Sequence, residues 1–342
     1  MKRKQVTIVV VIFLLLIVSV VITCVYIYNN LYKPTGEITK PVVVMVNRGD
    51  TFSDVAHSLK EKNAIENEKL FVALGRILEV ERKIKAGEYE IKPNMSPIAI
   101  LFNLLKGNVI EYSIMIPEGY NIYQIGDIIA LNGLEDKDTF ISLINDKEYI
   151  KTLGLKSSSL EGYLFPDTYK FNRGMSIQDI IALMIKRHET VFNEEKESWS
   201  ENGASLELTE YEVLIIASII EKETSGSGER EFVSAVFYNR LKKNMKLDSC
   251  ATVIYGMWDT FDGNLTRADL ERETSYNTYR ISGLPPTPIC NPGREAIHAA
   301  FNPADVDYLY FVSKNDGTHY FSNNLAEHNR AVYKYQKMRT YR

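Results

Sequence analysis

Residues 209–224 read Thr-Glu-Tyr-Glu-Val-Leu-Ile-Ile-Ala-Ser-Ile-Ile-Glu-Lys-Glu-Thr, and this stretch decides how the C-terminal half of the chain folds. Thr209 followed three residues later by Glu212 is a capping box, which predicts that a helix begins here. The next eight residues are apolar or small on every side, so the helix is expected to be buried all round. A carboxylate, Glu221, ends the apolar segment. Burial raises the pKa of a carboxyl group, and this suits Glu221 to donate a proton near neutral pH.

Glu221 and Glu223 lie two residues apart, which on a helix is a rotation of about 200°. They are therefore expected to point to opposite sides. Glu221 stays in register with small residues that suit a cleft, namely Ala217, Ser218 and Ser225. Glu223 is expected to pair with Lys222, Arg230 or solvent, and it is kept with Ser218 as a candidate substrate-binding residue. The alternative is an ordinary helix end with two solvated carboxylates.

The composition is that of a folded protein without a polyanionic partner. The 342 residues are 45% apolar and 25% charged, with a formal net charge of -4, which argues against disorder. No basic stripe with interleaved aromatic residues is present, so nucleic-acid binding is not expected. The 21 tyrosines suit carbohydrate, because their rings stack on sugar faces while their hydroxyls form hydrogen bonds. Core packing is the alternative role for most of them.

The N-terminus carries an apolar run, residues 6–28, that is long enough to cross a bilayer as a helix, which needs about 20 residues. Lys2, Arg3 and Lys4 precede it, so residues 1–5 are predicted to stay in the cytoplasm and the rest of the chain to lie outside. A cleaved signal peptide is the alternative, but the run is longer than a typical h-region and no small-x-small cleavage site follows. We predict an uncleaved signal anchor and a linker at 29–41.

An internal repeat follows the linker. Residues 44–56 are echoed by residues 114–126, and each copy reads as an alternating strand, a glycine turn and the start of a helix. The first copy opens a unit predicted at 42–107 that resembles a LysM module, whose role is either glycan binding or orienting the next domain. A second LysM-like repeat unit is predicted at 108–204, and the catalytic domain core at 205–342. The fold class is therefore α+β, with an N-terminal transmembrane helix.

Seven ordered segments carry a more specific pattern. They are Leu160–Tyr169, Ala217–Thr224, Val236–Leu241, Thr252–Gly256, Tyr276–Pro286, Tyr308–Val312 and His319–Asn329. In this order, and together with the membrane anchor, they resemble the YceG-like family of endolytic murein transglycosylases. The resemblance implies cleavage of the β-1,4 bond between N-acetylmuramic acid and N-acetylglucosamine within peptidoglycan glycan strands.

That reaction needs one carboxyl group, whereas ordinary glycoside hydrolases use two. The resemblance implies that Glu221 protonates the leaving oxygen. As a carboxylate, Glu221 then removes the proton of the sugar's own C6 hydroxyl while that oxygen attacks C1. The product is a 1,6-anhydro ring, and no water is consumed.

The motifs supply further candidate substrate-binding residues. Asn277, Tyr279 and Arg280 lie in a proline-bounded loop and are expected to hold sugar hydroxyls or acetamido groups, with hydrogen bonding within the loop as the alternative. Tyr255 and Tyr163 are expected to stack on sugar rings, with core packing as the alternative.

The chain departs from the family pattern at one place. Many members carry Asp-Pro where this chain has Cys250 and Ala251, which leaves Asp248 as the nearest carboxylate. Cys290 stands in the neighbouring proline-glycine stretch that the family shares, and this favours a Cys250–Cys290 disulfide over two buried free thiols.

No cofactor is expected. The five histidines show no spacing typical of zinc, and no nucleotide-binding or nucleophile-elbow motif is present. Two other functions remain open: a muramidase that uses water on the same bond, and a non-catalytic glycan-binding scaffold. The expected partners are glycan strands, the membrane and cell-wall synthases of the elongation or division machinery.

Overall fold

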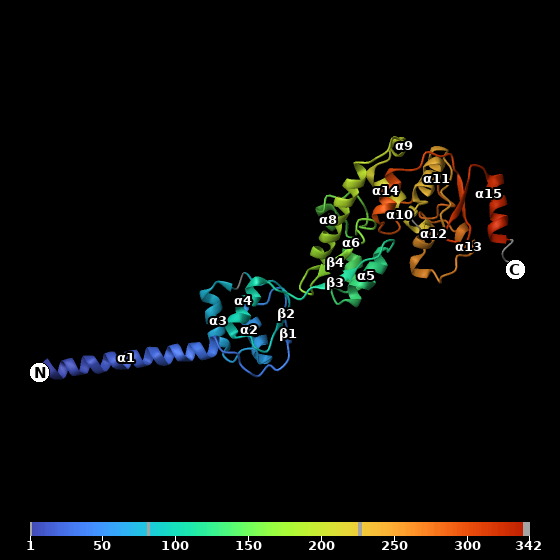
Figure 1. Cartoon of the computed structure of the whole chain (residues 1–342). Helices are drawn as coiled ribbons and strands as arrows, with labels where there is room; N and C mark the ends of the chain where they lie inside the picture. The colour runs from blue at the N-terminus through green and yellow to red at the C-terminus, as the bar shows by residue number, and fades with distance from the viewer. Residues whose placement is uncertain (1, 81–82, 225–227, 338–342) are drawn as a thin grey trace. The chain divides into compact units, whose positions relative to one another are not determined.

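The structure is a computed structural model that describes residues 2–80, 83–224 and 228–337, with only the backbone of residues 2–4. The chain begins with the helix α1 (Lys2–Leu31), drawn in dark blue in Figure 1. Its segment Gln5–Leu31 is apolar, exposed and long enough to cross a membrane. This helix has the length and composition of a single-pass membrane anchor, as the sequence predicts.

The chain divides into two compact units, which are described separately. The first comprises Met1–Ser113 and Lys170–Ser176, and the second comprises Ile114–Tyr169 and Ile177–Arg342. The domain limits expected from the sequence, at 107/108 and 204/205, stay predictions.

The first unit contains a two-stranded antiparallel sheet covered by helices. The strand β1 (Val42–Val46) pairs with β2 (Gly87–Ile91), with Val44 opposite Tyr89. The helices are α2 (Phe52–Glu61), α3 (Glu68–Ile77) and α4 (Pro97–Lys106). Their apolar faces bury a core against the sheet.

The strand, glycine turn and helix predicted for both copies of the repeat are present. In the second copy they are β3 (Tyr112–Met115) and α5 (Ile122–Leu131). Both helices begin with a capping box, at Thr51 before α2 and at Asn121 before α5. The strand β3 pairs with β4 (Thr168–Phe171), and the boundary between the two units runs through both strands.

The second unit is built around the buried helix α10 (Glu210–Glu223). Its N-terminal part adds α6 (Lys137–Ile144), α7 (Lys147–Thr152), α8 (Ile177–Lys196) and α9 (Glu201–Ala204). Its C-terminal part adds α11 (Arg230–Lys242), α12 (Cys250–Gly256), α13 (Arg267–Glu271) and α14 (Arg294–Phe301). The chain closes with the hairpin β5 (Tyr310–Ser313) and β6 (His319–Ser322), then α15 (Leu325–Val332).

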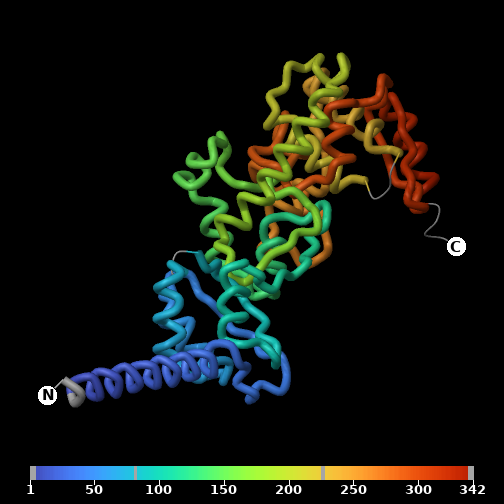
Figure 2. Tube along the Cα trace, turned by 60° about the vertical axis from the view of Figure 1, so that its left-hand side comes forward, coloured from blue at the N-terminus to red at the C-terminus, as the bar shows by residue number. Residues whose placement is uncertain are grey.

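The helix α10 has the expected capping box and a fully buried centre. The Thr209 backbone N–H donates to the Glu212 carboxylate at 2.8 Å, and every residue from Val213 to Ile220 is buried. This helix packs on α11, α12 and α14. In Figure 1 the hairpin lies between α11 and α15 and contacts both, and Figure 2 shows the same C-terminal segment in red as a tube.

Residues Cys250–Gly256 form the helix α12, and a serine, Ser249, precedes it. Ser249 stands at the N-cap without capping α12, and its hydroxyl instead donates to Glu223. The Ser249 hydroxyl therefore links α12 to α10 instead of capping its own helix.

Candidate functional site

The C-terminal end of α10 places two carboxyl groups in different surroundings. The helix ends at Thr224, whose hydroxyl donates to the Ile220 carbonyl at 2.8 Å. Glu221 and Glu223 lie in the last turn and take separate partners, as their rotation on the helix predicts. Ser225, expected in register with Glu221, lies outside the described residues.

The Glu221 side chain is largely buried at the N-terminus of α14. Its Oε2 accepts a hydrogen bond from the Gly293 N–H at 3.0 Å, at the N-terminus of α14. Its Oε1 lies 3.9 Å from Arg230 Nη2, and only 8% of the side chain is exposed. A Cβ on Gly293 would lie 2.0 Å from Glu118 Oε1, so a larger residue here would require the Glu118 side chain to move. Burial raises the pKa of Glu221, and the bond from Gly293 opposes that rise by favouring the charged form.

Glu223 faces the N-terminus of α12. Its Oε1 accepts a hydrogen bond from the Ser249 hydroxyl at 2.5 Å, and the backbone N–H of Ala251 also donates to it. Burial raises the pKa of Glu223, while the Ser249 bond and the nearby His319 lower it. Glu223 is thus a carboxyl group whose burial favours the protonated form and whose donors stabilise the anion.

A cavity of about 290 Å³ opens at Glu223. Glu221 is not among the residues that line this cavity. The lining residues are Gly119, Asn121, Lys222, Glu223, Cys250, Ala251, Ile254, Tyr255, Trp258 and Ile289. One carboxyl group (Glu223), two aromatic rings and a lysine therefore line the same cavity. This arrangement can bind a polar ligand and protonate it.

Another buried carboxyl group, Glu161, holds the cavity residue Tyr255 in place. Its Oε2 accepts hydrogen bonds from the Tyr255 hydroxyl at 2.9 Å and the Ile122 N–H at 3.1 Å. Its Oε1 accepts from Asn291 Nδ2 at 2.9 Å. Asn291 also accepts from the Leu164 N–H and donates to the Tyr120 carbonyl. Glu161 thereby joins α5, α12 and the loop before α14.

Burial raises the pKa of Glu161 to about 8. The Tyr255 hydroxyl both donates and accepts, so it gives the protonated acid a partner. The folded protein then holds this proton between about pH 4.5 and 8, where the unfolded chain has lost it. We therefore expect this group to contribute stability that is present below pH 4.5 and is lost as the pH rises through 8. The loss is at most about 1.4 kcal/mol per pH unit.

Urea unfolding of the full chain in detergent between pH 4.5 and 8.5 measures this effect. The matched control is Glu161→Gln, whose amide does not titrate, so the variant's free energy of unfolding should change less over this range. Parallel pH curves for the two proteins would contradict the titration of Glu161.

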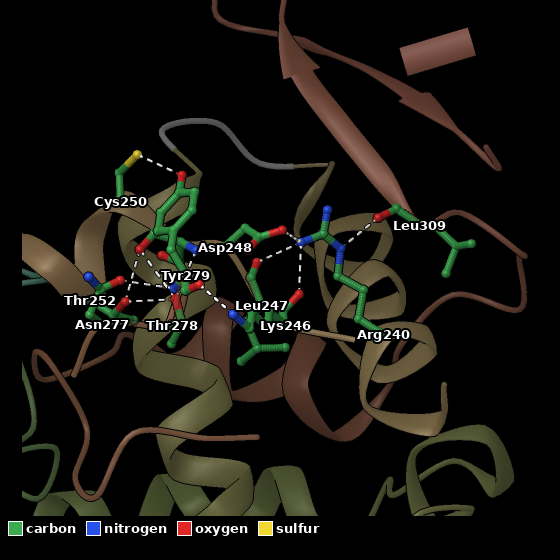
Figure 3. A network of polar contacts seen from close by, with 11 residues as sticks. Arg240, Lys246, Leu247, Asp248, Cys250, Thr252, Asn277, Thr278, Tyr279 and Leu309 are labelled. Carbon is green, nitrogen blue, oxygen red and sulfur yellow. Dashed lines mark hydrogen bonds and ion pairs between the residues drawn. The ribbon is translucent and has the colours of Figure 1, made fainter. Parts of the chain in front are cut away.

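Asp248, Tyr279 and Cys250 belong to a polar network between α11 and α12 (Figure 3). The Asp248 carboxylate accepts from Arg240 Nη1 at 3.0 Å. Arg240 also donates to the backbone carbonyls of Leu309, Lys246 and Leu247 at 2.7 to 3.0 Å. The Tyr279 hydroxyl lies 3.1 Å from Cys250 Sγ. Asp248 therefore fixes the segment that precedes α12 and does not face the Glu223 cavity, and of these three residues only Cys250 lines it.

Two of the predicted substrate-binding residues are fully buried and already bonded. Ser218 donates to the Ile215 carbonyl and accepts from the Ile289 N–H. Asn277 Nδ2 donates to backbone carbonyl oxygens, including that of Arg272 at 2.6 Å. Figure 3 shows Asn277 next to Thr278. Their hydrogen-bonding capacity serves the fold, which is the alternative considered for Asn277.

Tyr163 and Arg280 also lie outside the cavity. Tyr163 packs near-parallel to Tyr211 at 6.2 Å and edge-on to His188. Arg280 is half-exposed, 3.6 Å from a Glu273 oxygen. Of the predicted set, Glu223 and Tyr255 line the cavity.

The predicted Cys250–Cys290 disulfide is not formed. Cys250 is an exposed thiol beside Tyr279, whereas Cys290 is fully buried and donates to the Ser218 carbonyl at 3.3 Å. The two sulfurs point to different partners. Among the described residues, no group of three or more His, Cys, Asp or Glu side chains is arranged to hold a metal ion.

The sequence prediction missed Trp258, Ser249 and the role of Glu161. A signal existed for Glu161, because a carboxylate between Leu160 and the apolar pair Leu164 and Phe165 is expected to be buried with partners. Ser249 and Trp258 gave no such signal, since each takes its role from contacts with distant segments.

Comparison with known proteins identifies the family. The model of the YceG-like family matches residues 44–334. The chain belongs to the YceG-like family. It is 33% identical over 323 residues to a Bacillus subtilis protein named endolytic murein transglycosylase, covering 90% of this chain and 88% of the relative.

Two further relatives extend the comparison. A protein of the same name from Streptococcus pneumoniae D39 is 27% identical, and the match covers 90% of this chain and 60% of that relative. A crystal structure of a YceG-like protein from Listeria monocytogenes matches with a TM-score of 0.58 and 32% identity, covering 85% of this chain and 99% of that one.

Proposed function

We propose that this YceG-like protein is a membrane-anchored endolytic transglycosylase of peptidoglycan. It cleaves the β-1,4 bond between N-acetylmuramic acid and N-acetylglucosamine and leaves 1,6-anhydro ends. Support comes from the family, from the relatives named for this activity and from the N-terminal helix. The observation that carries the proposal is a single half-buried acid, Glu223, in a cavity with aromatic walls.

We assign the acid to Glu223, in place of the Glu221 expected from the sequence. Glu223 lines the cavity, whereas Glu221 is enclosed by Gly293 and Arg230. Protonated Glu223 donates to the leaving oxygen, and the O–C1 bond breaks as this proton is transferred. The resulting carboxylate, stabilised by the Ser249 hydroxyl, then takes the proton of the C6 hydroxyl as that oxygen bonds to C1. The proton balance closes within one residue, and no second carboxylate is required.

The positive residues before α1 and the absence of a comparable cluster directly after it favour a cytoplasmic N-terminus. The second unit, which contains the cavity, then lies outside the cytoplasm. Partnership with cell-wall synthases of the elongation or division machinery is part of the proposal and rests on the resemblance alone. Accessibility of engineered cysteines to a membrane-impermeant reagent in intact cells tests the orientation.

The products distinguish the three candidate functions. We expect the full chain in detergent, incubated with purified peptidoglycan, to release internal fragments that end in 1,6-anhydro-N-acetylmuramic acid. Mass spectrometry measures this, since a hydrolysed end is heavier by one water. Reducing ends would identify a muramidase and overturn the transglycosylase. Glycan binding without any released product would identify a scaffold.

A further inference from the structure

A second and larger cavity adjoins the Glu223 cavity. Its volume is about 580 Å³. Tyr255 and Trp258 line both cavities, so the two cavities meet at these residues, which we call the Tyr255–Trp258 wall. Both cavities lie within the second unit.

Four aromatic side chains line the larger cavity, and each of them packs against or hydrogen-bonds to a neighbour. The rings of Tyr123 and Trp258 are nearly parallel, with 10° between their planes and 6.1 Å between centroids. Tyr276 packs 5.1 Å from Tyr255, and its hydroxyl lies 2.8 Å from that of Thr287. Tyr255 is held by its bond to the buried Glu161. These aromatic surfaces are therefore preorganised before any ligand binds.

Most of the remaining lining is polar, with Ile122 and Met257 as apolar exceptions. It includes Asn145, Ser158, Ser159, Asp259, Arg272, Glu273 and Thr274. Flat apolar rings next to amide, hydroxyl and charged groups match a sugar, which has apolar ring faces and an equatorial belt of hydroxyl and acetamido groups. The larger cavity therefore has the chemistry of a carbohydrate site.

We propose that this cavity is a saccharide subsite that binds an N-acetylhexosamine residue of the glycan strand, with its ring on the Tyr123 and Trp258 faces. The neighbouring sugar passes the Tyr255–Trp258 wall and reaches Glu223. The position of the subsite relative to the cleaved bond rests on the proposed function, whereas the sugar binding does not. The enzyme would then bind the glycan strand at a sugar residue outside the bond that it cleaves.

The chain offers a direct probe, because it contains two tryptophans. Trp258 lines the cavity, while Trp199 packs against Phe301 in the core. In the variant Trp199→Phe of the full chain, Trp258 is the one tryptophan left, and excitation beyond the tyrosine absorption band reports on it alone. We expect titration with the β-1,4-linked tetramer of N-acetylglucosamine to change this fluorescence in a saturable way.

Two controls make the result specific. The variant Trp258→Phe retains the Trp199 signal, which the tetramer should leave unchanged. Adding Tyr123→Ala to Trp199→Phe removes half of the aromatic face and should weaken the apparent Kd by about tenfold. No fluorescence change with the tetramer up to millimolar concentration would overturn the subsite, and so would a response to the free stem peptide with none to the tetramer.

Kinetics separate this inference from the proposed function. On glycan strands stripped of stem peptides, Trp258→Ala should raise KM about tenfold. An unchanged KM would overturn the subsite even if the enzyme is active. Saturable binding of the tetramer by a protein that releases no products would overturn the proposed function and leave the subsite standing.

Discussion

Replacement of Glu223 by glutamine should abolish the release of anhydro products while leaving the fold intact. The amide still accepts from Ser249 and Ala251, but it has no acidic proton for the leaving oxygen and cannot act as a base for the C6 hydroxyl. General acid–base catalysis contributes about 10²- to 10⁴-fold, and Glu223 serves both steps. We expect kcat to fall by about 10³-fold or more, measured by muropeptide release at saturating peptidoglycan.

Glu221→Gln is the matched comparison, two residues earlier on the same helix. Its amide oxygen still accepts from the Gly293 N–H, and only the ion pair with Arg230 is lost. We expect a decrease in kcat of about tenfold or less, because Glu221 does not line the cavity that holds Glu223. Loss of all products in Glu221→Gln with activity retained in Glu223→Gln would show that the acid is Glu221, as the sequence pattern indicated.

The pH dependence gives a third readout of the same assignment. The Ser249 hydroxyl stabilises the Glu223 carboxylate and so lowers its pKa. In Ser249→Ala that pKa should rise, so the alkaline limb of kcat/KM, where the acid loses its proton, should move to higher pH. An unmoved limb would show that Glu223 does not set the profile.

The contrast between Glu221 and Glu223 shows how far a sequence determines a site. Helix periodicity was sufficient to predict α10, its capping box, its burial and the separation of the two carboxylates. It did not determine which carboxylate faces a cavity. That depends on α12 and on the turn before α14, segments that follow α10 by about 30 to 70 residues.

The same limit explains the buried polar residues. Asn277 was predicted to bind substrate from its place in a proline-bounded loop, and Ser218 from its register with Glu221. Both side chains instead form hydrogen bonds with backbone groups of the fold. A sequence motif marks positions where the residue type matters. A buried asparagine that holds a loop by hydrogen bonds is as restricted in type as an asparagine that binds a ligand. The strands, the helices and the anchor were predictable because local patterns specify them. The cavity walls were not, since each wall combines distant segments.

Replacement of Arg240 should produce the largest loss of stability in the second unit. Its guanidinium is almost fully buried and donates to the carbonyl oxygens of Leu309, Lys246 and Leu247 and to the Asp248 carboxylate (Figure 3). In Arg240→Met the apolar chain fills a similar space but leaves these acceptors without their donor. Unpaired buried polar groups cost about 1 to 3 kcal/mol each, and three buried carbonyl oxygens would lose their donor. The loss of the ion pair adds less, because 42% of the Asp248 side chain is exposed and water can replace Arg240 there.

We expect the free energy of unfolding to fall by about 3 to 5 kcal/mol, measured by urea unfolding of the full chain in detergent. Arg267→Met is the matched control, because Arg267 pairs with Glu271 on an exposed face of α13 and 91% of its side chain is exposed. An exposed pair contributes at most about 1 kcal/mol. Equal losses in the two variants would contradict the role assigned to Arg240. Because Arg240 holds the segment that leads into α12, its loss should also lower activity at temperatures where the protein is still folded. Such a decrease in activity would show that the Arg240 network positions α12 and, with it, the cavity residue Tyr255.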